Sequence, residues 1–228
     1  MKIEVWSDIV CPWCYIGKRR LEAALDGFDE EVEIQWRSFE LDPGAPRQPK
    51  LPLDKALAKK YGTSLDRARQ MMAQMTNTAK KEGLNFDFSI ARGGNTFDAH
   101  RLLHYAETKD MQDPMKERLL RAYMTEGRPI SERDELATLA ADVGLDADAV
   151  RAMLETDKFG DAVRKDEARA TDIGVRGVPF FLIDESSALS GAQPAETIRA
   201  ELQRVERQRH GPPSSAGPGC DDDSCEVR

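Results

Sequence analysis

Two cysteines near the N-terminus, Cys11 and Cys14, have the spacing and the setting of a redox-active pair. They follow a short apolar strand predicted over residues 3–6 and open a helix, so one helical turn separates the thiols. Free backbone N–H groups and the positive end of the helix dipole favour a thiolate at Cys11. Pro12 suits the first helical position, because it has no N–H to leave unpaired. The pattern therefore predicts a dithiol that performs thiol–disulfide exchange.

Three other interpretations of this pair are a structural zinc site, a structural disulfide and two unrelated buried cysteines. Zinc needs four ligands, usually including a second cysteine pair of similar spacing. The other two cysteines, Cys220 and Cys225, are five positions apart at the far end of the chain. A structural disulfide is rare in cytosolic proteins. The strand–CxxC–helix context favours the redox interpretation.

Composition narrows the class of protein. The chain has 228 residues, which is enough for one enlarged domain or two small ones. Its net charge is −8, so it lacks the excess of basic residues that is typical of proteins that bind nucleic acid. No apolar run approaches the length of a membrane span. The first six residues read as a strand and lack the long apolar core of a signal peptide. We therefore expect a cytoplasmic protein that binds neither nucleic acid nor membrane.

The segments that must position the dithiol alternate strand, helix and strand. After the cysteines, apolar residues continue at near-helical spacing to about residue 25, and residues 32–39 then alternate apolar and charged side chains. This βαβ unit should be parallel and right-handed. Strand patterns return over 177–184 and 188–191, close enough for an antiparallel hairpin, and a last helix is predicted over 194–208.

Between these parts the pattern is helical. Ser131 and Asp146 are predicted N-caps, the first in a capping-box-like Ser-Glu-Arg-Asp sequence. Helices are predicted over 53–60, 64–82, 96–108, 114–125, 131–143, 147–156 and 159–171.

The order of elements predicts an α/β fold, a thioredoxin-like domain with a mixed central sheet flanked by helices and a large all-helical insertion. Residues 1–45 and 172–209 would form the discontinuous thioredoxin-like domain, and residues 46–171 the insertion. Residues 210–228, rich in Gly, Pro and Ser and then acidic, would form a flexible acidic tail with a C-x4-C pair.

The Cys-Pro-Trp-Cys sequence at 11–14, together with Gly-Val-Pro-Phe-Phe at 177–181, resembles the DsbA-like branch of the thioredoxin superfamily. Over about residues 1–209 it resembles most the cytoplasmic FrnE-type protein disulfide oxidoreductases, whose helical insertion carries a pattern like residues 95–102. In the related 2-hydroxychromene-2-carboxylate isomerases and kappa-class glutathione transferases, serine occupies the place of Cys11. Cysteine here favours oxidoreductase chemistry.

The resemblance implies roles for further residues. Val178 and Pro179 would form the cis-proline loop that lies against the CxxC, exposes the Val178 backbone to substrate and keeps metals away from the thiols. The alternative is an ordinary trans proline that begins a strand. Pro12 and Trp13 bring no titratable group between the thiols. The resemblance also places His100 near the active cleft.

Asp8 and His100 are the other candidate modulators of the thiols. Asp8, three residues before Cys11, could tune the thiol pKa or accept a proton, or it could be a surface or capping residue. His100 and His104 have the i, i+4 spacing that can grip a metal. Because no third ligand is evident nearby, no metal site is predicted.

Cys220 and Cys225 leave three interpretations open. They could form an accessory redox pair that exchanges electrons with Cys11 and Cys14, a soft metal site assisted by residues 221–223, or incidental thiols. The intervening acidic residues should raise the pKa of both thiols, which suits a disulfide that is attacked better than a nucleophile. We favour the accessory redox role.

The sequence thus predicts an enzyme, a thiol–disulfide oxidoreductase with a potential isomerase activity, acting on protein thiols and disulfides. Cys11 would attack and Cys14 would resolve the mixed disulfide. It would need no cofactor beyond its redox-active disulfide, with glutathione or a thioredoxin system as reductant. The alternatives are a glutathione-dependent isomerase or transferase acting on a small aromatic substrate, and a chaperone-like binding module. The sequence carries no signal for the oligomeric state.

Overall fold

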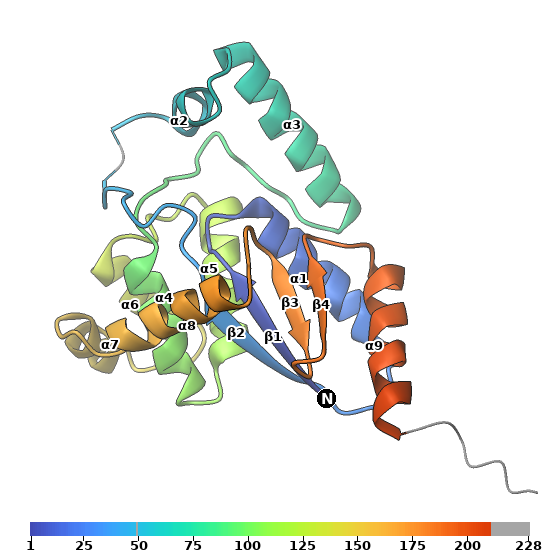
Figure 1. Cartoon of the computed structure of the whole chain (residues 1–228). Coiled ribbons are helices and arrows are strands. Elements are labelled where there is room, and N and C mark those ends of the chain that lie inside the picture. The colour runs from blue at the N-terminus through green and yellow to red at the C-terminus, as the bar shows by residue number, and fades with distance from the viewer. Residues whose placement is uncertain (49, 211–228) are drawn as a thin grey trace, which may run out of the picture.

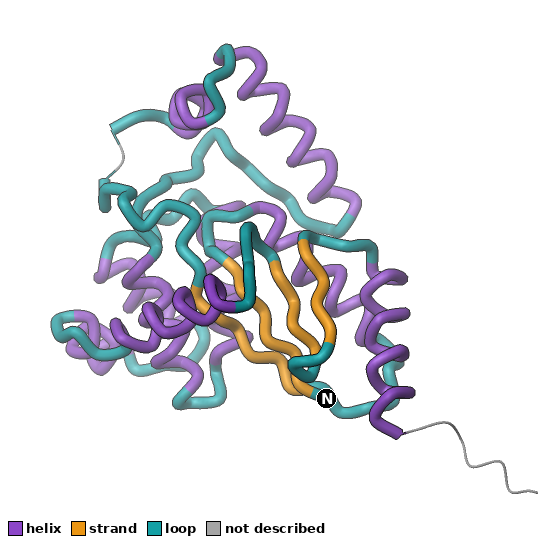
Figure 2. The backbone as a smooth tube through the Cα atoms, viewed as in Figure 1, coloured by secondary structure: helices purple, strands orange, loops and turns teal. Residues whose placement is uncertain are grey.

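A four-stranded mixed sheet lies at the centre of the computed structural model, which describes residues 1–48 and 50–210 (Figures 1 and 2). The strand order is β2-β1-β3-β4, with β1 parallel to β2 and antiparallel to β3, and β3 antiparallel to β4. Val5 is opposite Trp36 on one side and Phe181 on the other. The bounds are β1 (Lys2–Ser7), β2 (Glu33–Ser38), β3 (Phe180–Ile183) and β4 (Ser187–Ser190). The predicted mixed sheet is confirmed.

Helices cover both faces of this sheet. On one face α1 (Pro12–Leu25) and α9 (Ala195–His210) bury Leu21 and Leu202 against Val5 and Phe181. On the other face the Trp6 indole Nε1 donates to the Asp166 carbonyl oxygen of α8 (Gly160–Asp172) at 2.9 Å. Because β1 is covered from both sides, five of its six residues are buried. The loop that follows β1 therefore begins in the interior of the protein.

Among the described residues between β2 and β3 there are seven helices, as the helical periodicity predicts. Besides α8 they are α2 (Leu53–Lys60), α3 (Leu65–Lys81), α4 (Phe97–Glu107), α5 (Gln112–Met124), α6 (Arg133–Asp142) and α7 (Ala147–Leu154). Asp146 caps α7 and accepts from the amides of Asp148 and Ala149. Ser131 is not a cap: α6 begins two residues later, and the Ser131 hydroxyl donates to the Arg47 carbonyl oxygen at 2.7 Å.

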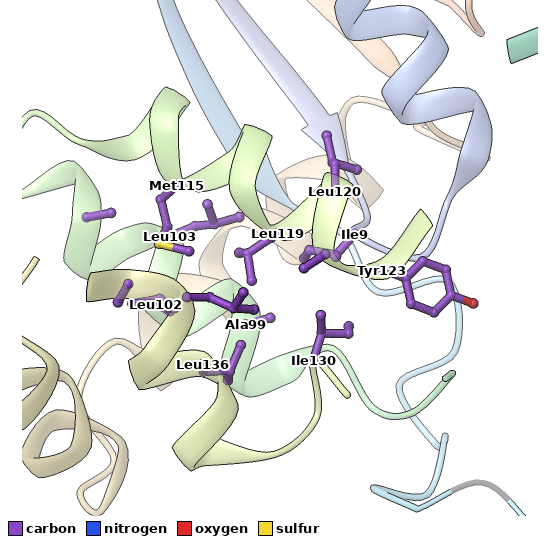
Figure 3. Close-up of a cluster of buried hydrophobic side chains, with 14 of the residues drawn as sticks. Ile9, Ala99, Leu102, Leu103, Met115, Leu119, Leu120, Tyr123, Ile130 and Leu136 are labelled. Carbon is purple, nitrogen blue, oxygen red and sulfur yellow. The ribbon is translucent and has the colours of Figure 1, made fainter. Parts of the chain in front are cut away.

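The inserted helices share a core with the dithiol loop. Ile9 and Ile16, which flank the two cysteines, belong to the same buried cluster as Leu102 of α4, Leu119 of α5 and Leu136 of α6 (Figure 3). The insertion is therefore packed onto the segment that carries the cysteines. Within the described part of the chain, no helix is long and apolar enough to cross a membrane.

The pair α2 and α3 projects from this body (Figure 1). No residue of α2 is buried, and in α3 only Ala68 and Ala79 are. The helices contact each other, and α3 also contacts α1. With so little apolar surface buried, this pair should be the least stable part of the insertion.

Candidate active site

Cys11 and Cys14 lie at the start of α1, directly beyond the end of β1. Cys11 is the N-cap residue with extended backbone (φ −89°, ψ 111°), and Pro12 occupies the first turn, as predicted. The Cys14 amide donates to the Cys11 carbonyl oxygen at 3.0 Å, which closes the turn and brings the residues together. Both thiols are buried, Cys11 with 4% of its surface exposed and Cys14 with 1%, so Cys11 is the more accessible.

The loop before β3 reaches this helix start from the other end of the chain. The peptide bond between Val178 and Pro179 is cis. The Cys11 Sγ lies 3.5 Å from the Val178 carbonyl oxygen, within hydrogen-bond distance for sulfur. Val178 is half-buried and Pro179 buried. The structure thus brings together two motifs whose contacting residues are 167 positions apart in the sequence.

The two thiols have opposite pKa shifts. The hydrogen bond from Cys11 to Cys14, burial and the charges of Cys14 and Asp8 raise the pKa of Cys11. Burial also raises the pKa of Cys14, but the hydrogen bond from Cys11 and the positive charge of Lys116 outweigh it, and the pKa of Cys14 is lowered. This differs from the expected thiolate at Cys11. The backbone hydrogen bond at the helix start lowers the pKa of Cys11, but the Cys14 sulfur and the Asp8 carboxylate raise it.

Asp8, three residues before Cys11, is fully buried, which rules out the surface interpretation. Its carboxylate accepts from the amides of Ile9 at 2.7 Å and Leu41 at 2.8 Å, and the His100 Nε2 lies 3.3 Å away. Burial raises the pKa of Asp8, but the hydrogen bonds and the charges of His100 and Lys116 outweigh it and lower the pKa. Asp8 is therefore a buried anion three residues before Cys11.

The two histidines of α4 do not converge on a common ligand position. His100 faces Asp8, whereas the His104 Nε2 lies 3.1 Å from both the Ser38 hydroxyl and an Asp166 carboxylate oxygen. Each histidine thus has its own carboxylate. Among the described residues, no group of three His, Cys, Asp or Glu side chains could hold a metal ion.

Lys116 of α5 is a buried residue of the site that the sequence analysis missed. It has no exposed surface, its Nζ donates to the Ser7 carbonyl oxygen at 3.4 Å, and it lies 5.4 Å from the centre of the Trp36 ring. Burial lowers the pKa of Lys116 to about 8. A signal was present: Lys116 shares the i, i+3, i+4 face with Leu119 and Leu120, so helical spacing turns it toward the core.

The remaining predicted site residues differ in accessibility. Trp13, between the two cysteines, is 42% exposed and forms an apolar surface at the dithiol. Cys220 and Cys225 lie outside the described residues.

A CxxC pair in the first turn of the helix after β1, facing a cis-proline loop on a four-stranded mixed sheet, defines a thioredoxin-type protein with a dithiol site. The model of the DSBA-like thioredoxin domain matches residues 2–203. This chain belongs to that family.

Two relatives are similar over nearly the whole chain. The uncharacterized protein YwbO of Bacillus subtilis (strain 168) is 31% identical over 209 residues, which cover 91% of this chain and 98% of that protein. The crystal structure of the probable DsbA oxidoreductase SCO1869 from Streptomyces coelicolor is 38% identical, with a TM-score of 0.88, and the match covers 100% of this chain and 99% of that chain.

Two more distant structures share the fold. The 2-hydroxychromene-2-carboxylate isomerase is 15% identical with a TM-score of 0.70, over 92% of this chain and 98% of that chain. The cytosolic disulfide reductase DsbM from Pseudomonas aeruginosa, solved with GSH, is 23% identical with a TM-score of 0.62, over 91% of this chain and 100% of that chain. The resemblance to DsbA-like oxidoreductases and their isomerase relatives is confirmed at the level of fold.

Proposed function

We propose that this protein is a thiol–disulfide oxidoreductase that acts on protein thiols and disulfides through Cys11 and Cys14. The observation that supports this most is the position of Cys11. It lies at the start of α1, and its Sγ is 3.5 Å from the Val178 carbonyl oxygen of the cis-proline loop. A substrate chain that pairs with the Val178 backbone would place its own sulfur beside Cys11. Similarity to the DsbA oxidoreductase group adds to this support.

The proposed chemistry has two exchange steps. The Cys11 sulfur attacks a substrate disulfide when the proton that it shares with Cys14 lies on Cys14, and the displaced substrate sulfur leaves as a thiolate. Cys14 then gives up its proton and attacks the Cys11 sulfur, the mixed disulfide breaks, and the second substrate sulfur leaves as a thiolate. The substrate has gained two electrons, its two sulfurs take up the Cys14 proton and one proton from solvent, and Cys11 and Cys14 have become a disulfide. The reverse sequence oxidises a substrate dithiol.

The neighbours of the dithiol have supporting roles in this proposal. Asp8, held by His100, places a negative charge near Cys11 and opposes its ionisation. Trp13 offers an exposed apolar ring to the substrate, and Pro12 begins the helix. No cofactor is needed beyond the disulfide itself.

The proposed setting is the cytoplasm, with glutathione or a thioredoxin system returning the pair to the dithiol. The glutathione pool of the cytosol has a low reduction potential, so it keeps a reductase or an isomerase supplied with electrons more easily than it lets an oxidant stay oxidised. The fold shared with a cytosolic disulfide reductase that was solved with GSH agrees with this choice of reductant. We also propose that Cys220 and Cys225 serve as an accessory redox pair.

The experiment that tests this function is reduction of insulin disulfides by glutathione, with the full chain as catalyst. The wild-type chain should accelerate the reduction, and Cys11→Ser should fall to the rate of glutathione alone. Cys14→Ser should accumulate a mixed disulfide at Cys11. Equal rates for the wild-type chain and Cys11→Ser would contradict the function, and would leave a binding module or a glutathione-dependent isomerase as the explanation.

A further inference from the structure

Two lysines are buried near the dithiol, and their surroundings differ. Lys18 of α1, 3% exposed, forms ion pairs with Glu22, Asp113 and Glu117. Lys116 is completely buried, and no carboxylate of the described residues lies within ion-pair distance of its Nζ. A buried ammonium group without a partner is costly, so a position that retains one usually has a use for its charge.

The contacts of Lys116 place this charge at the C-terminal end of β1, four residues before Cys11. Its Nζ donates to the carbonyl oxygen of Ser7, the last residue of β1, and lies over the ring of Trp36 of β2. These contacts satisfy one N–H and stabilise a cation, but neither supplies a negative charge. An anion is therefore the missing partner of this site.

Titratable groups face Lys116 from several elements. Among these groups, the charge of Cys14 of α1 raises the pKa of Lys116 most, followed by the charges of Asp8, beyond β1, and Cys11. The charge of Lys18 lowers the pKa of Lys116. From α4, His100 reaches this group only through Asp8. The Asp8 carboxylate is already held by two backbone amides and His100. Cys14 is thus the anion-forming group that still lacks a charged partner.

We propose that Lys116 is a positioning residue that holds the Cys14 sulfur as a thiolate while it resolves the mixed disulfide. This inference rests on the proposed exchange function of the site and assigns a charge partner to its second step. In the free dithiol, Cys14 receives a hydrogen bond from Cys11. In the mixed disulfide the Cys11 sulfur is bonded to substrate and has no proton to donate, so Lys116 is the positive charge that remains to stabilise the Cys14 thiolate, beside the neutral Ser7 hydroxyl and a backbone hydrogen bond at Asp8.

The step is balanced without any other reactant. The Cys14 thiol loses its proton and attacks the Cys11 sulfur, the bond between Cys11 and the substrate sulfur breaks, and the substrate thiolate leaves and takes up a proton. Lys116 keeps its own proton throughout. Its charge lowers the energy of the attacking thiolate without taking part in a bond.

A titration of Cys14 alone tests this pairing. In the full chain with Cys11→Ala, Cys220→Ser and Cys225→Ser, Cys14 is the sole thiol, because the chain has four cysteines. Its ionisation is followed by the ultraviolet absorbance of the thiolate. Replacing Lys116 by Met should raise the midpoint by about one pH unit, an approximately tenfold loss of thiolate at neutral pH. Lys116→Arg, which keeps the positive charge, should return the midpoint most of the way to that of the chain with native Lys116. An unchanged midpoint in folded Lys116→Met would overturn the proposal.

A second measurement covers the case in which Lys116→Met does not fold. In the chain with native Lys116, the titration of its ammonium group is followed by nuclear magnetic resonance, with Cys14 present and with Cys14→Ser. Removal of the sulfur anion should lower the pKa of Lys116, and an unaltered lysine titration would overturn the pairing. Neither titration uses a disulfide substrate, so a failed insulin assay would count against the proposed function and not against the charge interaction between Lys116 and Cys14.

Discussion

Gly17 of α1 lies directly against the ring of Pro179: a β-carbon on Gly17 would lie 2.8 Å from the Pro179 Cγ and 3.4 Å from the Phe181 Cζ. A contact of 2.8 Å is essentially never seen for a real β-carbon, so glycine at this position lets the cis-proline loop approach the helix. The same approach brings the Val178 carbonyl oxygen to 3.5 Å from the Cys11 Sγ. One absent methyl group thus contributes to the geometry of the site.

Gly17→Ala should therefore displace the loop from the helix. We expect a loss of about 1–3 kcal/mol in the free energy of unfolding, since overpacking costs about this much, together with reduced insulin reduction. Gly177→Ala is the matched control, because a β-carbon at Gly177 meets nothing within 4 Å. It should change stability by no more than about 0.5 kcal/mol. Denaturant unfolding of both variants measures the difference, and equal losses would contradict the close-approach account.

Asp8 should make stability depend on pH in the acid range. Its pKa is lowered in the folded chain, so its contribution to stability is complete above the unfolded value of about 3.9 and is lost as the pH falls through the folded value. Asp8→Asn should remove this part of the acid dependence. It should also cost about 1–3 kcal/mol near neutral pH, because buried hydrogen-bond partners lose their carboxylate. Identical pH dependence of unfolding in Asp8→Asn and the wild-type chain would contradict this assignment.

Asp8→Asn has a separate effect on the thiol. The Asp8 charge raises the pKa of Cys11, so the variant should ionise Cys11 at lower pH and react faster with an alkylating agent in mildly acidic solution. The pH profile of alkylation at Cys11, read by mass spectrometry of the intact chain, measures this. A profile shifted to higher pH would mean that Asp8 acts as a base instead.

Trp13 should contribute to substrate binding and little to folding. Because 42% of its surface is exposed, Trp13→Ala should leave the free energy of unfolding within about 0.5 kcal/mol of wild type. The KM for a protein disulfide should rise, while turnover of a small disulfide should stay unchanged. Equal losses on both substrates would place Trp13 in the chemistry of the dithiol rather than in the binding surface.

The C-terminal cysteines can be tested in the same assay. If they form an accessory redox pair, Cys220→Ser/Cys225→Ser should lower the steady-state rate without changing the reduction potential of Cys11 and Cys14. A double variant with unaltered rate and potential would remove the accessory pair from the account.

The fold could be predicted because its signals are local. Alternation and helical spacing identified the strands and the helices of the described chain, and the order of these elements indicated the mixed sheet. The cis-proline loop was identified by resemblance. Cap positions do not follow from local pattern alone, because they depend on tertiary neighbours: the Ser131 hydroxyl donates to the Arg47 carbonyl oxygen, 84 residues away, instead of capping α6.

The charges of the site were harder to predict, since burial of a charged side chain depends on distant partners. His100, which reaches Asp8, is 92 residues away in the sequence, and Lys116 is 109 residues from Ser7. Helical spacing turns Lys116 toward the core, but the spacing alone does not identify the groups that it meets there. The pKa order of the thiols depends first on burial and on the hydrogen bond between the two sulfurs, and then on the charges of Asp8 and Lys116, none of which the helix-start argument includes.

The reduction potential of Cys11 and Cys14 tests the central claim most directly. The full chain is equilibrated in glutathione buffers of graded potential, quenched with an alkylating agent, and analysed by mass spectrometry of the peptide that carries both cysteines. The account predicts one two-electron transition between dithiol and disulfide, with a midpoint nearer thioredoxin, about −270 mV, than DsbA, about −120 mV. A pair that forms no disulfide at any potential would contradict the account.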